Sequence, residues 1–461
     1  MLFSDPAFGV FFVFYFGAHL VTPPRFRIYL LIVGSTIFYG WWKIEYVWLP
    51  YLLSAIAWFG VLFIDQAKEQ KTRKRRLVGT LLLLFVPLVA FKYTHFLIHD
   101  VLGLSAQPLD DKFRLALPLG VSFVTFTLTA YVVDTYRGQF PPVRQFSSIL
   151  GYVLFFPHLI AGPILRPHEL LPQLSKIRRA LDARFTLGAS LFVLGLCKKL
   201  VFADAIAPYV DNVYTPGAHG TYDYLLAIYG FSAQIYCDFS GYTDMAVGLA
   251  YLLRIRLPQN FRSPYSSRSI VEFWRRWHIT LSFWLRDYLY IALGGNRLGF
   301  ARQLVNLMIT MLLGGLWHGA NWTFVVWGGL HGCALALNHM LNRFWPNFRL
   351  PGWLGVLLTF HFVTLAWIYF RSPNLSVARD ILAGPLTGSA QDPWVFLAEH
   401  AYPVLLIVVF LALHPFDSHA RIRLALKATS RAVAWALLLV LSTLAIALSQ
   451  GSSAKFIYFD F

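Results

Sequence analysis

Long apolar runs alternate with short polar connections along most of the chain. Six of these runs are 18 to 23 residues long and contain no Asp, Glu, Lys or Arg. Each matches the roughly 20 residues that a helix needs to cross a bilayer. With shorter apolar runs included, the pattern predicts an all-α polytopic membrane protein with about 10 to 13 membrane-embedded helices. The six runs are Ala7–Pro24, Tyr46–Ile64, Leu115–Val133, Gln145–Leu165, Leu350–Phe370 and Ala432–Ala454.

Composition and charge placement support this class. Of the 461 residues, 57% are hydrophobic and 13% are charged, whereas soluble domains carry roughly a quarter charged residues. A net charge of +17 does not indicate nucleic-acid binding, because no soluble domain with a basic face is present. Lys and Arg gather instead in Lys68–Arg76, Lys176–Arg184 and Arg421–Arg431, which the positive-inside rule places in the cytoplasm. Counting back from the first of these predicts a periplasmic N-terminus without a cleavable signal peptide.

Residues 254–302 break the pattern of clean spans. Eight arginines between Arg254 and Arg297 interrupt a segment that is rich in aromatic residues. Trp274, Trp277 and Trp284 beside these arginines are typical of a membrane–water boundary. We therefore expect interfacial or re-entrant helices on the cytoplasmic side.

The next 40 residues, Gln303–Asn342, contain no charged side chain and are interrupted by Gly314-Gly315 and Gly319. A helix break at membrane depth is tolerated where it is buried in protein or lines a water-filled cavity. We therefore expect His318 to lie at depth near such a break, with Asn321 and His331 as possible polar partners. An intramembrane histidine is a candidate functional residue.

Two carboxylates, Asp238 and Asp244, lie in a run that is otherwise apolar from Tyr224 to Leu253. A buried carboxylate needs a cation or hydrogen-bond donors, and the arginines at 254–276 are the nearest candidates in sequence. We favour a structural role for both aspartates. A catalytic role for either remains open.

Few other chemistries fit the residues present. Cys197, Cys237 and Cys333 lie in apolar stretches without pairing or zinc-binding spacing, so we expect neither a disulfide nor a bound metal. The His95-x4-Asp100 spacing matches that of some acyltransferases, but a plain helix terminus would also place these residues there. The stronger candidates for a catalytic histidine are His278 and His318. From composition and spacing alone, each could instead be a hydrogen-bonded histidine of the protein core.

Several motifs together resemble the membrane-bound O-acyltransferase superfamily. They are Phe273-Trp-Arg-Arg-Trp-His278, Asp287-Tyr-Leu-Tyr-Ile-Ala-Leu-Gly-Gly-Asn-Arg297 and Leu316-Trp-His318-Gly. The run Asp238-Phe-Ser-Gly-Tyr-Thr-Asp244 and the closing Phe456-Ile-Tyr-Phe-Asp-Phe461 are similar to the bacterial alginate and peptidoglycan O-acetylation branch. That branch is related to the teichoic-acid D-alanyl transferase.

The resemblance implies a fold with a through-membrane tunnel, and it implies His318 as the catalytic histidine with His278 assisting. Trp317 and Asn321 would support them. The donor would be acetyl coenzyme A or another cytosolic acyl thioester, with no permanently bound cofactor, and the arginines on the cytoplasmic side would hold its phosphates. The interpretation that we favour for these arginines is that they are topology-setting charges in contact with anionic lipid. They are Arg262, Arg268, Arg275 and Arg276.

The acceptor implied by the resemblance is a hydroxyl of an extracytoplasmic polysaccharide, reached through a periplasmic acetyltransferase partner from the bacterial inner membrane. D-alanyl transfer to teichoic acid is the alternative within the enzyme class. A polymer or lipid-precursor transporter is the alternative from another class, but we find no internal repeat of the kind that many transporters show. We expect one integral-membrane domain with N-terminal spans (1–230), a catalytic core (231–345) and C-terminal spans (346–461).

Overall fold

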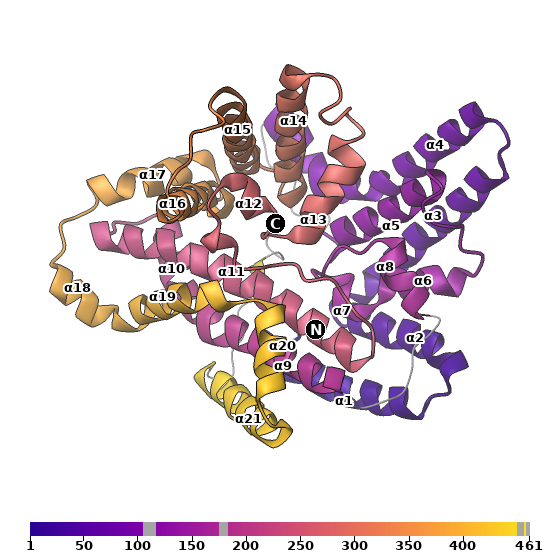
Figure 1. The fold of residues 1–461 in the computed structure, drawn as a ribbon, viewed down its shortest axis with the longest axis horizontal. Helices are drawn as coiled ribbons and strands as arrows, with labels where there is room; N and C mark the ends of the chain where they lie inside the picture. The colour runs from indigo at the N-terminus through magenta and orange to yellow at the C-terminus, as the bar shows by residue number, and fades with distance from the viewer. Residues whose placement is uncertain (105–116, 175–182, 450–455, 458–461) are drawn as a thin grey trace. The chain divides into compact units, whose positions relative to one another are not determined.

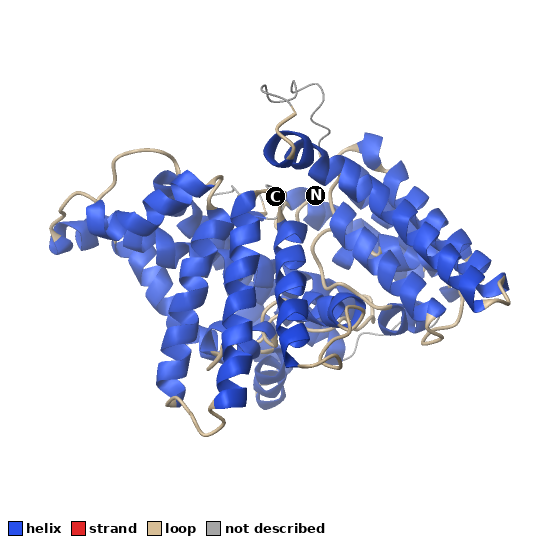
Figure 2. Ribbon diagram, turned by 90° about the horizontal axis from the view of Figure 1, so that it is seen from above, coloured by secondary structure: helices blue, strands red, loops and turns tan. Residues whose placement is uncertain are grey.

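Helices make up the fold of the computed structural model, which describes residues 1–104, 117–174, 183–449 and 456–457. Figures 1 and 2 show helices joined by loops over these residues. Within them the β pairing is confined to one isolated bridge between Gly220 and Ser389. The predicted class, an all-α polytopic membrane protein, is confirmed.

The first of two compact units comprises residues 1–189 and 245–258. At its centre lies α5, which packs against α3 and α4 and buries 14 of its 16 residues. The helices of this unit are α1 (Pro6–Val21), α2 (Arg27–Gly40), α3 (Trp48–Gln66), α4 (Gln70–Leu88), α5 (Val121–Tyr136), α6 (Phe146–Leu154), α7 (Phe156–Leu159) and α8 (Pro167–Leu174).

The second unit comprises residues 190–244 and 259–461, so α9 (Ala183–Cys197) and α11 (Thr221–Leu252) each contribute to both units. The three segments expected from the sequence stay a prediction. The remaining helices are η6 (Lys198–Ala203), α10 (Asp204–Tyr214), η7 (Pro264–Ser266), α12 (Ile270–Trp274), α13 (Ile279–Trp284), η8 (Leu285–Tyr290), α14 (Phe300–His318), α15 (Trp322–Phe344), α16 (Gly352–Arg371), α17 (Leu375–Thr387), α18 (Pro393–Glu399), α19 (Ala401–Leu413), η9 (His414–Phe416), α20 (His419–Ala428) and α21 (Arg431–Leu448).

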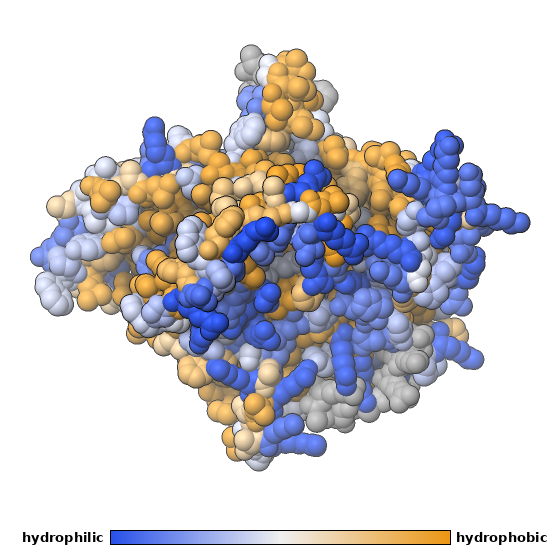
Figure 3. All heavy atoms as spheres, turned by 45° about the horizontal axis from the view of Figure 1, so that its top comes forward, coloured by the Kyte–Doolittle hydropathy of each residue, from blue (hydrophilic) through white to orange (hydrophobic). Residues whose placement is uncertain are grey.

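Seven helices in the described part of the chain are long and apolar enough to cross a membrane, and an eighth results if α18 and the segment Ala401–Phe416 form one bent span. Large apolar side chains lie exposed on these helices, for example Leu82 on α4 and Leu439 on α21. Figure 3 shows hydrophobic side chains over much of the face that it draws. This surface suits hydrocarbon rather than water as the surrounding solvent.

Two details of the sequence-based expectation are wrong. The run Gln145–Leu165 is not one span, because the helix ends at Leu154 and a separate short helix, α7, begins beside Pro157. A proline interrupts helical hydrogen bonding, which accounts for the break. The tryptophans of 254–302 are not boundary residues either, since Trp274, Trp277 and Trp284 are buried in the protein.

The basic segments also take a different form from simple loops. Most of Lys68–Arg76 lies in the first turns of α4, and much of Arg421–Arg431 lies on α20. Most of Lys176–Arg184 falls outside the described residues.

Close packing of α14 against α15 positions the helix break that follows His318. A side chain at Gly315 would collide with the carbonyl oxygen of Phe324, and one at Gly328 would collide with that of Met311. Small residues let helices approach at backbone distance, a common device in membrane bundles. The helix pair therefore holds His318, the last residue of α14, beside the first turns of α15.

Candidate active site

His278 is fully buried and lies at the start of α13, after the short helix α12. Its backbone adopts a left-handed conformation with φ of 41°, which is uncommon for a residue other than glycine and costs of order 1–3 kcal/mol. Such strain tends to occur at functional sites. Burial lowers the pKa of His278 to about 3, so the imidazole is neutral at physiological pH.

Asn260 fixes the tautomer of that imidazole. Its Oδ1 accepts the backbone N–H of Thr280 at 3.1 Å and the Thr280 hydroxyl at 2.9 Å. Because the backbone N–H can only donate, the atom facing it must be the amide oxygen. Oδ1 also lies 3.2 Å from Nδ1 of His278, so Nδ1 carries the proton and Nε2 carries the basic lone pair.

His318 is 3% exposed and is enclosed by aromatic rings. The ring centroids of Trp317, Trp327 and Phe370 lie 4.9, 5.2 and 5.2 Å from its own. All three contacts are edge-to-face, with interplanar angles of 68° to 84°. The enclosure excludes bulk water, which strengthens electrostatic interactions at the ring.

The two predicted histidines are brought together, although 39 residues separate them in sequence. The indole of Trp317 contacts both, with its centroid 6.3 Å from that of His278 and 4.9 Å from that of His318. Phe239 of α11 also contacts His278, with the ring centroids 4.8 Å apart. Both histidines therefore belong to one aromatic core in the second unit.

Unsatisfied polar atoms gather beside His318. The indole nitrogens of Trp274 and Trp327 and both ring nitrogens of His331 are buried without a hydrogen-bond partner in the described structure. The three rings contact one another, with centroids 4.7 to 5.9 Å apart, and Trp327 also contacts His318. Buried polar atoms nearly always have partners, so this cluster has the chemistry of a site for a hydrogen-bonding ligand or an ordered water.

Asn321 has a positioning role that is visible in the structure. Its Oδ1 accepts the backbone N–H of Thr323 and so caps α15, while its Nδ2 donates to the carbonyl oxygen of Pro373. Ser, Thr, Asp and Asn caps of this kind stabilise a helix start by about 1 kcal/mol. Both polar groups of Asn321 thus fix backbone next to His318, and a direct partnership with that histidine stays a prediction.

The four candidate phosphate-binding arginines differ in their surroundings. Arg276 pairs with Glu272 one helical turn away at 2.5 Å. Arg262, Arg268 and Arg275 are exposed, and the structure gives their guanidinium groups no hydrogen-bond partner within the described ranges. These three side chains are therefore available to a soluble anion.

Asp238 and Asp244 pair with lysines rather than with the expected arginines. Lys198 Nζ lies 2.6 Å from Asp244 and 2.5 Å from Asp417, and His419 Nε2 lies 2.7 Å from Asp244. Lys199 Nζ lies 2.8 Å from Asp204 and 2.9 Å from Asp238. These side chains are at most 17% exposed, so the pairs compensate the charges that they bury.

A close helix crossing explains this pairing. A Cβ on Gly241 would meet the carbonyl oxygen of Gly195 at 2.7 Å, so α11 and α9 touch through their backbones there. Asp238 and Asp244 lie three residues before and after Gly241, on the same face of α11. That face meets Lys198 and Lys199 at the end of α9. The sequence signals of this pairing are the Asp-x2-Gly-x2-Asp spacing and the two adjacent lysines.

The C-terminal segment also contacts α11. Phe456 is fully buried, with its ring 4.7 Å from that of Tyr242 and 6.1 Å from that of Phe239. The backbone N–H of Ile457 donates to Asp238 at 2.7 Å. The remaining residues of the closing motif, 458–461, lie outside the described residues.

The His95-x4-Asp100 pattern forms no obvious dyad. The Asp100 carboxylate contacts His99, at 2.9 Å, and both side chains are about one third exposed. No group of three or more His, Cys, Asp or Glu side chains that could hold a metal ion is found in the part of the chain that the structure describes.

Comparison with known proteins identifies relatives over most of the chain. A model of the membrane-bound O-acyltransferase family matches residues 36–375. A protein named probable alginate O-acetylase from Azotobacter vinelandii is 40% identical over 390 residues, covering 83% of this chain and 77% of the relative. A peptidoglycan O-acetyltransferase from Helicobacter pylori is 38% identical over 394 residues, covering 78% of this chain and 74% of the relative.

A more distant relative is a teichoic acid D-alanyltransferase from Bacillus subtilis. It is 28% identical over 311 residues, covering 63% of this chain and 76% of the relative. The matches therefore include proteins named for transfer of two different acyl groups.

Proposed function

The chain belongs to the membrane-bound O-acyltransferase family and is an acyltransferase, and we propose that it moves an acetyl group from a cytosolic thioester toward hydroxyls of an extracytoplasmic polysaccharide. The acceptor class is alginate-like exopolysaccharide or peptidoglycan, in keeping with the names of the relatives at 38–40% identity. The observation that carries the proposal is that the rings of His278 and His318 both contact the indole of Trp317 inside one buried aromatic core.

In the proposed reaction His318 acts as the general base. A neutral imidazole takes the proton of an acceptor hydroxyl as the oxygen attacks the thioester carbonyl carbon. The carbon–sulfur bond then breaks, and the departing thiolate recovers the proton. Histidine suits this role because its reference pKa lies near neutral pH.

His278 assists in this proposal through Nε2. The Asn260 contact places the proton on Nδ1, so Nε2 can accept a hydrogen bond from a substrate group or an intervening water. Its neutral state at physiological pH supports this assignment.

The unsatisfied donors of Trp274 and Trp327 supply a partner for the acyl carbonyl oxygen. The indole N–H of Trp327, whose ring contacts His318, and that of Trp274, whose ring contacts Trp327, resemble the donor pairs that stabilise the oxyanion in acyl transfer. Under this proposal the negative charge that develops on the carbonyl oxygen is held by protein donors in a site without bulk water.

Replacing Trp327 by Phe should lower kcat by roughly 10²–10³-fold, because it removes one such donor while keeping an aromatic ring. The matched control is Trp367→Phe, which removes an equally buried indole whose N–H already donates to Tyr265. Acetyl transfer and thermal unfolding would be measured for both variants. An unchanged kcat in a folded Trp327→Phe protein would exclude the donor role.

Arg262, Arg268 and Arg275 are proposed to hold the phosphates of acetyl coenzyme A. Their exposure and lack of protein partners support this assignment, as does the geometric match between guanidinium and phosphate. The donor is a substrate in this proposal, and no bound cofactor is required.

The Arg262→Ala and Arg275→Ala double variant should raise the KM for acetyl coenzyme A by roughly 10²-fold or more at low salt, since each of the two lost hydrogen bonds to a charged group is worth about 1.5–3 kcal/mol. The rise should shrink as salt screens the wild-type contacts. The test is transfer of labelled acetyl by purified protein, with Arg379→Ala on α17 as the control for an exposed arginine. If the variant and the wild-type protein had the same KM at every salt concentration, these arginines would have no role in donor binding and would only set the membrane topology.

Access and topology complete the proposal. The protein lies in a bacterial inner membrane with its N-terminus on the periplasmic side, and a tunnel brings donor and acceptor to His318 from opposite faces. Because His318 is 3% exposed, side chains that cover it must move to admit the substrates. A periplasmic acetyltransferase partner would complete the transfer to the polymer.

A further inference from the structure

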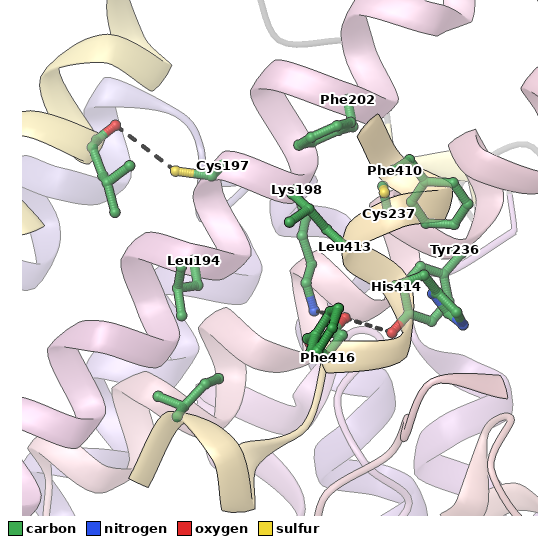
Figure 4. Close-up of a pocket in the computed structure, with 13 residues that line it drawn as sticks. Leu194, Cys197, Lys198, Phe202, Tyr236, Cys237, Phe410, Leu413, His414 and Phe416 are labelled. Atoms are coloured by element: carbon green, nitrogen blue, oxygen red, sulfur yellow. Dashed lines mark hydrogen bonds and ion pairs between the residues drawn. The ribbon is translucent and has the colours of Figure 1, made fainter. Parts of the chain in front are cut away.

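A cavity of about 350 Å³ lies in the second unit, and its lining includes His414 but neither His278 nor His318. It is at the small end of the range for ligand sites, so it can hold one chain rather than a whole lipid. Figure 4 shows side chains from α9, α11 and the α19–η9 segment around it. Most of its lining is apolar, from Leu194, Phe202, Phe410, Leu413, Phe416, Ile422 and Leu441.

A few polar groups converge on one part of the lining. Lys198, Tyr236 and Asp417 all contribute to the cavity wall. Both the Lys198 ammonium and the Tyr236 hydroxyl contact the same carboxylate oxygen of Asp417, Oδ2, at 2.5 and 2.6 Å. The structure gives Oδ1 of Asp417 no hydrogen-bond partner among the described residues, although a carboxylate accepts up to about four hydrogen bonds.

The charges around Asp417 determine which kind of ligand group can bind at this part of the cavity. The single ammonium of Lys198 is shared by two carboxylates, Asp244 and Asp417. Asp244 also contacts His419, so Asp417 is the carboxylate that has an oxygen to spare. An N–H donor with positive charge would complete the hydrogen bonding of Asp417, whereas an added anion would lie beside its carboxylate and could not donate to it. The site therefore favours an ammonium group over a phosphate.

Much of the cavity wall belongs to helices that are long and apolar enough to cross a membrane. They include the span Phe185–Tyr214, the span Arg431–Leu448 and the bent pair that ends at Phe416. Leu413 and Phe416 are 57% and 64% exposed, so the surface around the cavity faces the hydrocarbon of the bilayer. The apolar ligand available at such a surface is an acyl chain of a lipid.

We propose that this cavity binds one acyl chain of a zwitterionic membrane lipid whose primary ammonium head group donates to Asp417. Phosphatidylethanolamine has this chemistry. Phosphatidylcholine has the same net charge and similar chains but no N–H donor, so the two lipids isolate the proposed contact. The site is independent of the acetyl-transfer proposal.

The test is native mass spectrometry of the full chain mixed with each lipid separately. Phosphatidylethanolamine should be retained roughly tenfold more strongly than phosphatidylcholine, the ratio expected for one charge-assisted hydrogen bond. Equal retention of the two lipids would overturn the proposal, and so would stronger retention of anionic phosphatidylglycerol.

A pair of variants on α21 locates the binding. Leu441→Trp fills the cavity and should abolish the preference for phosphatidylethanolamine, whereas Leu439→Trp, at a position 69% exposed and outside the lining, should keep it. The same loss in both variants would contradict the assigned position.

His318→Ala should retain the lipid, so failure of the acetyl-transfer proposal and failure of the lipid-binding proposal are distinguishable. The comparison of lipids on the wild-type protein remains informative if Leu441→Trp does not fold.

Discussion

His318→Ala is expected to abolish measurable acetylation of the polysaccharide in cells while the protein remains folded and inserted in the membrane. Loss of a general base alone lowers a rate by roughly 10²–10⁴-fold. The imidazole is enclosed by Trp317, Trp327 and Phe370, so no water from bulk solvent is placed to replace it. The effect should therefore appear in kcat, with little change in the amount of protein recovered.

The control for His318→Ala is His361→Ala on α16, where a half-buried ring hydrogen-bonds the carbonyl oxygen of Leu357. That variant should acetylate normally. Polymer-bound acetate, protein in the membrane fraction and thermal unfolding in detergent would be measured for both. Normal acetylation by a folded His318→Ala protein would remove the catalytic role assigned to this histidine.

Lys199→Met is expected to give the largest loss of stability. Its ammonium compensates the carboxylates of Asp204 and Asp238, and all three side chains are at most 10% exposed. Removing one partner of a buried pair leaves uncompensated charge and costs about 3–5 kcal/mol. Because Asp238 also anchors the backbone of Ile457, the C-terminal contact with α11 should loosen as well.

Thermal unfolding of purified protein would measure the effect, with Lys74→Met at an exposed position of α4 as the control. Adding Asp238→Asn to Lys199→Met should recover part of the loss, because the second change removes one of the orphaned charges. Wild-type stability in Lys199→Met would show that these charges are solvated rather than buried in a shared network.

Hydropathy predicted the class of fold well because the bilayer imposes a single strong constraint, namely that apolar segments of about 20 residues form helices. Hydropathy did not predict helix breaks or the burial of single side chains. Pro157 divides Gln145–Leu165 into separate helices although the run carries no charge. Trp277 is 1% exposed although its arginine neighbours indicated a boundary position. A side chain's partner across the fold, which hydropathy does not encode, determines whether it is buried.

The sequence predicted some of the residues that the candidate site brings together, and their catalytic roles stay a prediction. His278 and His318 do share one aromatic core, and their motifs carried that expectation. Asn260 was missed because nothing near it in sequence marks a partner for a histidine 18 residues later. Lys198 and Lys199 were missed because lysines at the end of an apolar run usually mark the end of a membrane helix. In the structure the membrane-length segment continues through both lysines to Tyr214.

The most direct test of the central claim is acetyl transfer across a bilayer by the purified protein. Vesicles containing the protein would enclose the polysaccharide and, where the acceptor requires it, a periplasmic acetyltransferase, with labelled acetyl coenzyme A added outside. The account predicts label on the enclosed polymer with the wild-type protein and none with His318→Ala. Label on the polymer with both proteins, or with neither although the donor is consumed, would contradict it.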